Sequence, residues 1–445
     1  MRIRFFAAPV GVALTIAACS EVSPTAVPDI ARREARSGGD SVPVVSSVKP
    51  NKSLRGTTLD VRVFGSGFDQ GSTVQLALDG VATDEVVTNS TTYVNSHELI
   101  ANVTISADAE GALYDVIVTS SSGKPGIGTE SFEVTVEMTL LPTLGETTQA
   151  GATGINEAGD ISGYAYLPGS GGRAMLWTRG IPRNLGVLAG FDQSRAEGLN
   201  NRGQVVGYAM AFRDGKWKSK AFVWSRESGM QPLMSPGDSR ALAINDAGMV
   251  IGNATDETGR WRVTVWINGV PNYLPRQAFT AYDINARGEV VGAAAPFDVA
   301  GELEWSSAYI WSAQEGFRYL NTLQGSLGEP LGINDNGDVV GWGPAADGPW
   351  GYGFVIRRGV AQNLAATGGE SSVGFKIAGN GLVVGRGQNT AAIWSVNGTM
   401  LLLPTPIGGT YVEALDMNSR GEAVGSVQLD ARNGFEQRAI KWRVY

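Results

Sequence analysis

Cysteine and histidine are almost missing from this chain of 445 residues, which contains one of each, Cys19 and His97. Disulfide-stapled scaffolds and most zinc sites need more of these side chains, and a His-based catalytic triad would have to be built on His97, so the sequence argues against all three. The sequence also contains no Gly-x-Ser-x-Gly nucleophile elbow. We therefore expect no metal and no other cofactor.

Charged residues make up 18% of the sequence, below the usual ~25%, whereas the 60 glycines are about twice the average share of roughly 7%. This composition favours many short strands joined by tight turns, and it argues against coiled coils and helical bundles. Since the chain is longer than one ordinary domain, we predict an all-β protein of two or three domains. The net charge of −8 gives no overall basic face, so no nucleic-acid partner is expected.

The first 18 residues are typical of a secretory signal peptide. Arg2 and Arg4 precede an apolar stretch over 7–17, which is shorter than the ~20 residues needed to span a bilayer. The stretch leads into Ile16-Ala17-Ala18-Cys19, which resembles a bacterial lipobox. The resemblance implies cleavage before Cys19, lipidation of Cys19 and membrane anchoring through several acyl chains. The alternative is an ordinary signal peptide that happens to contain a cysteine.

Ser20 follows the cysteine, and by the same resemblance its identity favours the outer membrane over the inner one. Residues 19–42 include Pro24 and Pro28, two glycines and little apolar content. Such a segment cannot bury a core, so we expect the lipidated cysteine to be followed by a disordered tether. The predicted location is the cell envelope, on either side of the outer membrane.

Residues 43–136 show period-two alternation cut by turn residues about every 8–12 positions, which is typical of a β-sandwich. Leu59, Val61 and Val63, for example, alternate with polar neighbours. The stretch also contains, in this order, Pro50, Gly56, Phe64-Gly65-Ser66-Gly67-Phe68 and Tyr114-Asp115-Val116. This order resembles the IPT/TIG immunoglobulin-like family, and the resemblance implies an Ig-like sandwich that serves as a spacer or interaction surface. His97 lies in a polar stretch of this segment, and we expect it at the surface.

A nine-residue phrase recurs through residues 137–445. Its first copy is Ile155-Asn156-Glu157-Ala158-Gly159-Asp160-Ile161-Ser162-Gly163, and one weakened copy has Ala378 in the place of the asparagine. The seven copies are spaced 40–49 residues apart and end at Gly163, Gly207, Gly252, Gly292, Gly341, Gly385 and Gly425. A second phrase follows each copy and ends in a slot filled by Trp177, Trp224, Trp266, Trp311, Ile356, Trp394 and Trp442.

Each repeat predicts four short strands, which is the blade of a β-propeller. In the second unit, the first strand runs into Asn200, the second covers 204–209, a longer loop leads to the third at 220–225, and the fourth lies near 230–234. Asn and Gly tolerate the positive φ that the short turn after the first strand demands. An isolated strand at 138–144 supplies the fourth strand that the last unit lacks, which would close a ring of seven blades and leave no exposed edge. A solenoid of the same repeats is the structural alternative.

The Ile-Asn-x-x-Gly-x-Val-Val-Gly and Ala-x-x-Trp phrases resemble the bacterial extracellular HAF repeats, over residues 138–445. The usual His-Ala-Phe spelling before the Trp is replaced here by Arg173-Ala174-Met175 and Lys220-Ala221-Phe222. The resemblance implies the fold and secretion. It implies no activity, because none is well established for that family.

Four further tryptophans precede the slot of units two to five by 7, 5, 6 and 6 residues, namely Trp217, Trp261, Trp305 and Trp350. This spacing predicts positions at the end of the loop between the second and third strands, or at the start of the third strand. Those loops lie on the propeller face most often used for ligands, and Trp342 and Tyr352 of the fifth unit are candidates to join them. Exposed aromatic rings suit stacking on sugar rings or gripping an extended polypeptide, because they combine apolar area with a polar edge. The alternative is that these rings pack beneath their own loops and stiffen them.

No acidic pair among the 43 Asp and Glu residues stands out as catalytic. Asn334-Asp335-Asn336-Gly337-Asp338 loosely resembles a calcium loop, but other copies replace its acids, so we interpret it as the turn of the repeat. The leading hypothesis is non-catalytic binding or scaffolding at the cell envelope, with a polysaccharide or an envelope protein as partner. A secreted polysaccharide-active enzyme with its carboxylates on the propeller face is one alternative, and a passive structural surface protein is another.

Overall fold

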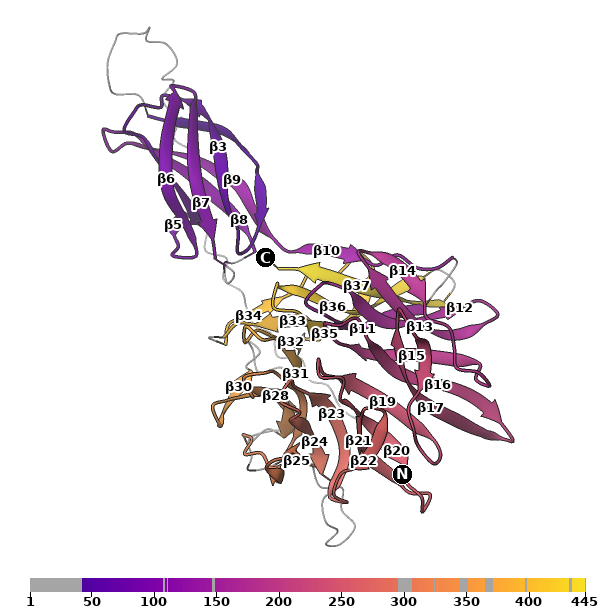
Figure 1. The fold of residues 1–445 in the computed structure, drawn as a ribbon. Coiled ribbons are helices and arrows are strands. Elements are labelled where there is room, and N and C mark those ends of the chain that lie inside the picture. Colours follow the sequence, from indigo (N-terminus) through magenta and orange to yellow (C-terminus); the bar gives the residue numbers. More distant parts are fainter. Residues whose placement is uncertain are drawn as a thin grey trace, which may run out of the picture. The chain divides into compact units, whose positions relative to one another are not determined.

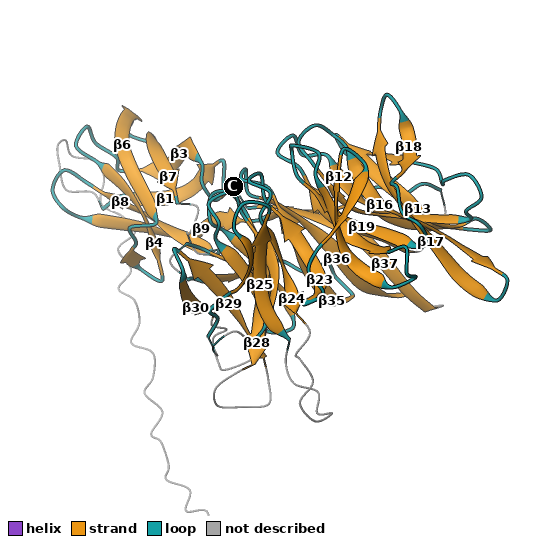
Figure 2. Ribbon diagram, turned by 60° about the horizontal axis from the view of Figure 1, so that its bottom comes forward, coloured by secondary structure: helices purple, strands orange, loops and turns teal. Residues whose placement is uncertain are grey.

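The computed structural model describes residues 42–106, 109, 111–145, 149–294, 306–323, 325, 327–344, 351–364, 371–396, 398–431 and 434–444. All regular secondary structure in these residues is β-strand (Figures 1 and 2). The prediction of an all-β protein is therefore confirmed. The same residues contain no helix with the length and apolar character to cross a membrane.

The first nine strands form two sheets. The first sheet contains, from edge to edge, β1 (Val44–Lys49), β3 (Thr58–Ser66), β7 (Glu98–Ile105) and β6 (Val86–Asn95). The second contains β2 (Lys52–Leu54), β9 (Pro125–Thr135), β8 (Leu113–Thr119), β4 (Thr73–Leu78) and β5 (Val81–Ala82). Neighbouring strands are antiparallel, except that β2 and β9 are parallel.

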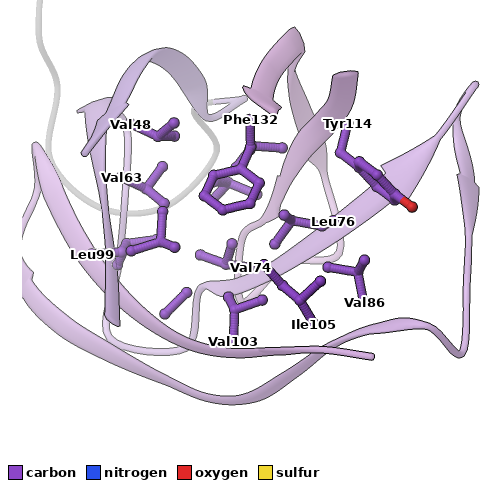
Figure 3. Packing of buried hydrophobic residues seen from close by; sticks show 14 of the residues in the cluster. Val48, Val63, Val74, Leu76, Val86, Leu99, Val103, Ile105, Tyr114 and Phe132 are labelled. Carbon is purple, nitrogen blue, oxygen red and sulfur yellow. The ribbon is translucent and has the colours of Figure 1, made fainter. Parts of the chain in front are cut away.

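The core of these two sheets consists of alternate residues from facing strands (Figure 3). The buried residues of β7 are Leu99, Ala101, Val103 and Ile105, and the residues between them are only partly covered. Phe132 of β9 belongs to the same cluster as Val61 and Val63 of β3, and Leu59 packs against its edge. The period-two alternation of the sequence thus separates a buried face from a solvated one.

Five consecutive four-stranded antiparallel sheets lie further along the chain. The first two contain β15 (Gln193–Leu199), β16 (Val205–Arg213), β17 (Lys216–Ser225) and β18 (Gly229–Pro232), then β19 (Ser239–Ile244), β20 (Val250–Thr255), β21 (Trp261–Ile267) and β22 (Val270–Tyr273). The third contains β23 (Ala278–Ile284), β24 (Val290–Ala294), β25 (Ser307–Ser312) and β26 (Gly316–Tyr319). The last two contain β27 (Glu329–Ile333), β28 (Val339–Pro344), β29 (Gly351–Arg357) and β30 (Val360–Leu364), then β31 (Ser372–Ile377), β32 (Val383–Gly387), β33 (Thr390–Trp394) and β34 (Met400–Leu402).

Eight further strands come from both ends of this region. They are β10 (Glu137–Leu140), β11 (Gln149–Ile155), β12 (Ile161–Leu167), β13 (Gly171–Thr178) and β14 (Ile181–Asn184), with β35 (Gly409–Met417), β36 (Glu422–Ala431) and β37 (Gly434–Arg443). They separate into two antiparallel groups of four, β11 to β14 and β35-β36-β37-β10, joined by one parallel pairing between Gln149 and Gln437. The isolated strand seen in the sequence therefore pairs with the last strand of the chain, from Glu137 opposite Arg443 to Leu140 opposite Ile440.

A tight turn joins the first two strands of each sheet, and the turn between β15 and β16 illustrates its chemistry. The side-chain Oδ1 of Asn200 accepts the backbone N–H of Gln204 at 3.0 Å, and Gly203 has a φ of 72°. The glycine that closes the repeated phrase has another role, because a Cβ at Gly207 would overlap the carbonyl oxygen of Arg195 on the paired strand. The spelling of the repeat thus follows from the turn and from close backbone approach.

The asparagine side chains connect neighbouring turns into a ring. Their Nδ2 atoms donate to the backbone carbonyl of the matching residue in the next turn over 3.0–3.2 Å, from Asn156 to Asn200, Asn200 to Asn245, Asn245 to Asn285, Asn285 to Asn334, Asn334 to Ala378 and Asn418 to Asn156. Ala378 has no amide to donate, and Asn380 of the same turn bonds the Ser419 carbonyl at 3.0 Å. The bond from Asn418 to Asn156 joins turns that lie 262 residues apart in the chain.

Buried apolar side chains fill the space between neighbouring sheets. One cluster combines Leu176 of β13 with Phe222 and Trp224 of β17. Indole N–H groups cross such boundaries at 2.7–2.9 Å, from Trp177 to the Pro142 carbonyl, from Trp266 to that of Met234 and from Trp442 to that of Pro404. Four-stranded antiparallel sheets packed face to face, with their first strands tied into a ring, form a β-propeller.

One local expectation is wrong. In place of a longer loop between the second and third strands, β16 and β17 continue their ladder to a pairing of Arg213 with Lys216. Asp214 and Gly215 make the turn with φ values of 52° and 71°. An Asp-Gly pair adopts this conformation readily, so the hairpin extends as far as this turn allows.

Candidate functional site

The candidate ligand-binding residues of the sequence lie only partly in the described chain. Trp305 and Trp350 lie outside the described residues, as does the predicted lipidation residue Cys19. Trp217 and Trp261 begin or nearly begin the third strands of two successive sheets, and Tyr352 lies near the start of β29. His97 is exposed, as the sequence suggested.

Trp217 lies near the tip of the long hairpin of β16 and β17. It is 55% exposed and meets the 53% exposed Phe212 edge to face, with ring centroids 5.5 Å apart and planes at 64°. The two residues are direct cross-strand partners. The guanidinium of Arg213 donates to both carboxylate oxygens of Asp192 at 2.7 Å, which ties the hairpin to the strand before it.

Trp261 lies at the matching end of the next sheet, opposite Thr255, and is 48% exposed. The turn before it is built around Asp256, whose Oδ1 accepts the hydroxyl of Thr258 at 2.6 Å and the N–H of Arg260 at 3.0 Å. These and further hydrogen bonds lower the pKa of Asp256 to about 2. The exposure of both tryptophans shows that their rings do not lie buried beneath their own loops.

Tyr352 occupies a different environment. It is half-buried and pairs across the sheet with Gly343. Its neighbour on β28, Trp342, donates its indole N–H to Glu329 Oε2 at 3.1 Å. The described part of the chain shows no ring contact between Trp217, Trp261 and Tyr352, so the structure brings two exposed rings to one end of successive sheets but not into a single cluster.

A charged cluster on the innermost strands was not found from the sequence. Lys376 of β31 places Nζ 2.7 Å from Asp283 Oδ1 of β23. Asp283 also accepts the N–H of Ile333 at 2.9 Å, and Asp416 of β35 accepts the N–H of Ile155 at 2.9 Å. Each carboxylate therefore holds the innermost strand of another sheet.

The electrostatics of this cluster depend on its burial. Burial raises the pKa of Asp416 to about 6, although Lys376 and two backbone N–H donors favour its ionised form. Burial also lowers the pKa of Lys376, but Asp283 and Asp416 outweigh it, so the pKa of Lys376 lies above its ordinary value. Lys376 keeps 31% of its side-chain exposure, because it also lines a cavity of about 220 Å³ at the ring of asparagine turns.

A small residue leaves room for the long reach of Lys376. The sheet between those of Asp283 and Lys376 carries Gly332 at the matching position, two residues before the asparagine of the repeat. A Cβ there would lie 2.8 Å from the carbonyl oxygen of Phe375. Aligning the repeats on their asparagines shows this signal, since Asp283, Lys376 and Asp416 are the charged residues at that position.

Arginine–tyrosine pairs form a second layer between neighbouring sheets. The guanidinium of Arg195 lies 3.8 Å from the ring centroid of Tyr164, and that of Arg240 lies 4.8 Å from Tyr208. Arg195 also donates to Glu197 at 2.8 Å, and burial raises the pKa of Glu197. These contacts join adjacent sheets as cation–π and ionic pairs, so they stabilise the ring of strands.

No set of three or more His, Cys, Asp or Glu side chains in the described residues could hold a metal ion. The carboxylates of Asp283 and Asp416 already accept bonds from backbone N–H groups, and Asp283 also binds Lys376. The cluster of Asp283, Lys376 and Asp416 therefore holds the innermost strands together. The exposed aromatic end, by contrast, offers ring faces to a partner.

Comparison with known proteins gives no family. No protein-family model matches the sequence, and no curated protein matches it. Similar solved structures include a protein of unknown function from Bacteroides thetaiotaomicron, with 11% identity, a TM-score of 0.36, and coverage of 92% of this chain and 100% of that one. Another is TolB from Acinetobacter baumannii, with 12% identity, a TM-score of 0.34, and coverage of 57% and 60%. A third is a gluconolactonase from Xanthomonas campestris, with 12% identity, a TM-score of 0.37, and coverage of 68% and 99%. Similarities this low carry no conclusion about activity.

Proposed function

We propose that the chain is a lipid-anchored protein of the cell envelope that binds a polysaccharide or an envelope protein without catalysis. In this proposal Cys19 carries the lipid, residues 19–42 form a tether, residues 43–136 form an Ig-like domain and residues 137–445 form a seven-bladed propeller. The two-sheet sandwich and the closed ring of turns support this organisation.

The exposed aromatic rings at one end of successive sheets carry the functional proposal. Trp217, Phe212 and Trp261 each expose about half of their surface, on hairpins that are held by the ion pair of Arg213 with Asp192 and by the hydrogen bonds of Asp256. Rigid rings in this setting offer flat apolar faces at little entropic cost, which suits stacking on sugar rings or on the side chains of an extended chain.

The test uses the full-length protein in a detergent without a sugar headgroup, on a panel of immobilised envelope polysaccharides. It scores retention of the protein and release of new reducing ends. We expect retention without release, and at least a tenfold loss of affinity in W217A/W261A, since each ring is worth about 1 kcal/mol. Y319A is the matched control, because it removes a 50% exposed ring from the outer strand β26.

Two results would contradict the proposal. Release of sugar ends would make the protein an enzyme. Retention that W217A/W261A and Y319A weaken equally would remove the aromatic end from the mechanism. If no polysaccharide is retained, cross-linking to envelope proteins in wild type and in W217A/W261A decides whether the same rings bind a polypeptide.

A further inference from the structure

A second feature lies at the other end of the sheets, where the asparagine turns are. In three of these turns an arginine stands two residues after the asparagine, at Arg202, Arg287 and Arg420. Each guanidinium lies over the glycine of the next turn, where a Cβ would touch it. The covered glycines are Gly248, Gly337 and Gly159.

Other turns cover their neighbour differently. Gly288 lies against the side chain of Met249, and Gly381 against that of Val396. Gly203 differs from all of these, because no atom of the described residues lies within 4 Å of the place where its Cβ would stand. The residue that would cover it, two positions after Asn156, is Ala158, and a methyl group is too short to reach.

The uncovered turn opens a cavity of about 570 Å³ between the sheet of β11 to β14 and the sheet of β15 to β18. This volume lies within the roughly 300–1,000 Å³ that small-molecule sites occupy. The lining contains Asp160, Leu176 and Thr178 from the first sheet, and Arg202, Gln204, Trp224, Ser225, Arg226 and Glu227 from the second. Both sheets thus contribute side chains that can form hydrogen bonds.

Trp224 has an unusual position at this cavity. It is only 3% exposed, and its ring lies 5.1 Å from the guanidinium of Arg183. The indole N–H of its equivalents Trp177 and Trp266 bonds a carbonyl of the neighbouring sheet. At the Trp224 boundary the corresponding carbonyl, of Gly186, accepts the hydroxyl of Ser194 at 2.5 Å instead, and no described residue accepts the Trp224 N–H.

The composition of the lining indicates the class of ligand. Asp160 and Glu227 accept hydrogen bonds and Arg226 donates them, whereas the guanidinium of Arg202 lies over Gly248 of the next turn. An anionic ligand would be repelled by the two carboxylates and a cationic one by the guanidinium of Arg226, whereas hydroxyl groups both donate and accept hydrogen bonds. We infer that this cavity is a binding site for a neutral sugar residue. The site stands on residues separate from those that carry the proposed function, so the two can fail independently.

The experiment titrates the full-length protein, in a detergent without a sugar headgroup, with D-glucose, D-galactose, D-mannose and cellobiose. Saturation-transfer NMR and calorimetry report binding, and D-glucuronate and D-glucosamine serve as charged comparators. We expect millimolar binding of at least one neutral sugar and weaker binding of both charged ones.

The decisive variant is A158R, which copies the arginine of the other turns and fills the cavity over Gly203. We expect it to lower the affinity at least tenfold. A247R is the matched control, since Ala247 occupies the same exposed turn position but faces Gly288, which Met249 already covers. D160N removes one acceptor charge without adding bulk, and we expect it to weaken binding about tenfold.

The inference is overturned if none of the neutral sugars binds, if A158R binds as well as A247R, or if glucuronate or glucosamine binds best. W217A/W261A separates it from the proposed function. Unchanged monosaccharide binding in that variant supports the cavity as the site. Lost monosaccharide binding would mean that monosaccharides bind at the aromatic end, and it would overturn the inference. If A158R loses polysaccharide retention while W217A/W261A keeps it, the aromatic end is refuted as the polysaccharide site, and the inference about the cavity is not.

Discussion

Replacing Asp416 with asparagine should remove a pH dependence from the stability of the propeller. Burial raises the pKa of this carboxyl from 3.8 to about 6 in the folded chain. As the pH rises from 4, the unfolded chain therefore loses this proton before the folded chain does, and folding is stabilised progressively less up to about pH 6. A pKa difference of about 2 corresponds to about 3 kcal/mol.

D416N carries no titrating group at this position. The free energy of unfolding of D416N minus that of the wild type should therefore rise by about 2 kcal/mol between pH 4 and pH 7, because the carboxyl of the unfolded chain is already more than half ionised at pH 4. Other carboxyls titrate alike in both proteins and cancel in the difference. The constant part of the difference reports the hydrogen bonds that the amide makes less well with the N–H groups of Ile155 and Met417.

Urea unfolding followed by tryptophan fluorescence measures this difference at each pH. D256N is the control, because hydrogen bonds from Thr258 and its neighbours lower the pKa of Asp256 to about 2. The difference in the free energy of unfolding between D256N and the wild type should stay constant between pH 5 and pH 7, where Asp256 is ionised in both the folded and the unfolded chain. A D416N difference that is equally flat from pH 4 to pH 7 would refute the reasoning that burial controls this carboxyl.

Two further substitutions test the inner strands. K376M leaves Asp283 and Asp416 without their cation, and because Lys376 is 31% exposed we expect the free energy of unfolding to fall by only about 2 kcal/mol. Urea titrations should show a larger loss at pH 8 than at pH 5. Equal losses at both pH values would show that the lysine does not stabilise the ionised carboxylates. G207A should cost about 3 kcal/mol or more in the same assay, since its Cβ overlaps the Arg195 carbonyl, whereas G203A at a φ of 72° in open space should cost about 1 kcal/mol. Similar losses for the two alanine variants would mean that the closing glycine is not required by backbone approach.

Much of the fold could be predicted because the sequence repeats its turn chemistry. The asparagine and the glycine three residues after it mark every first turn but that of Ala378, and the buried Trp177, Trp266 and Trp442 occupy the slot expected for packing between sheets. The pairing of the strand at Glu137–Leu140 with the last strand followed from counting strands per repeat. The length of the hairpin of β16 and β17 could not be predicted in this way. The repeat pattern indicates a loop between these strands, whereas the local Asp214-Gly215 pair forms a tight turn.

The candidate site was predicted only in part. The positions of Trp217 and Trp261 follow from their distance to the slot, and their exposure is in keeping with a binding role. Asp283 and Lys376, by contrast, are 93 residues apart and meet across an intervening sheet whose Gly332 has no side chain. The cavity at Gly203 exists because the neighbouring turn has Ala158 where other turns have an arginine. A missing side chain of this kind is not seen in a search for residues that recur.

The pairing of β10 with β37 has a consequence for synthesis. Strand β10 is made before every other strand of the propeller, and its partner β37 is made after all of them. Domains fold as the chain emerges, at roughly 5–20 residues per second, but this ladder has no partner until translation reaches residue 443. Until then the growing stack keeps one unpaired edge at each end, which invites pairing with other chains. A nascent chain therefore stays open to misassembly for the whole time that its repeats are being made, and the ring cannot close before β37 has been synthesised.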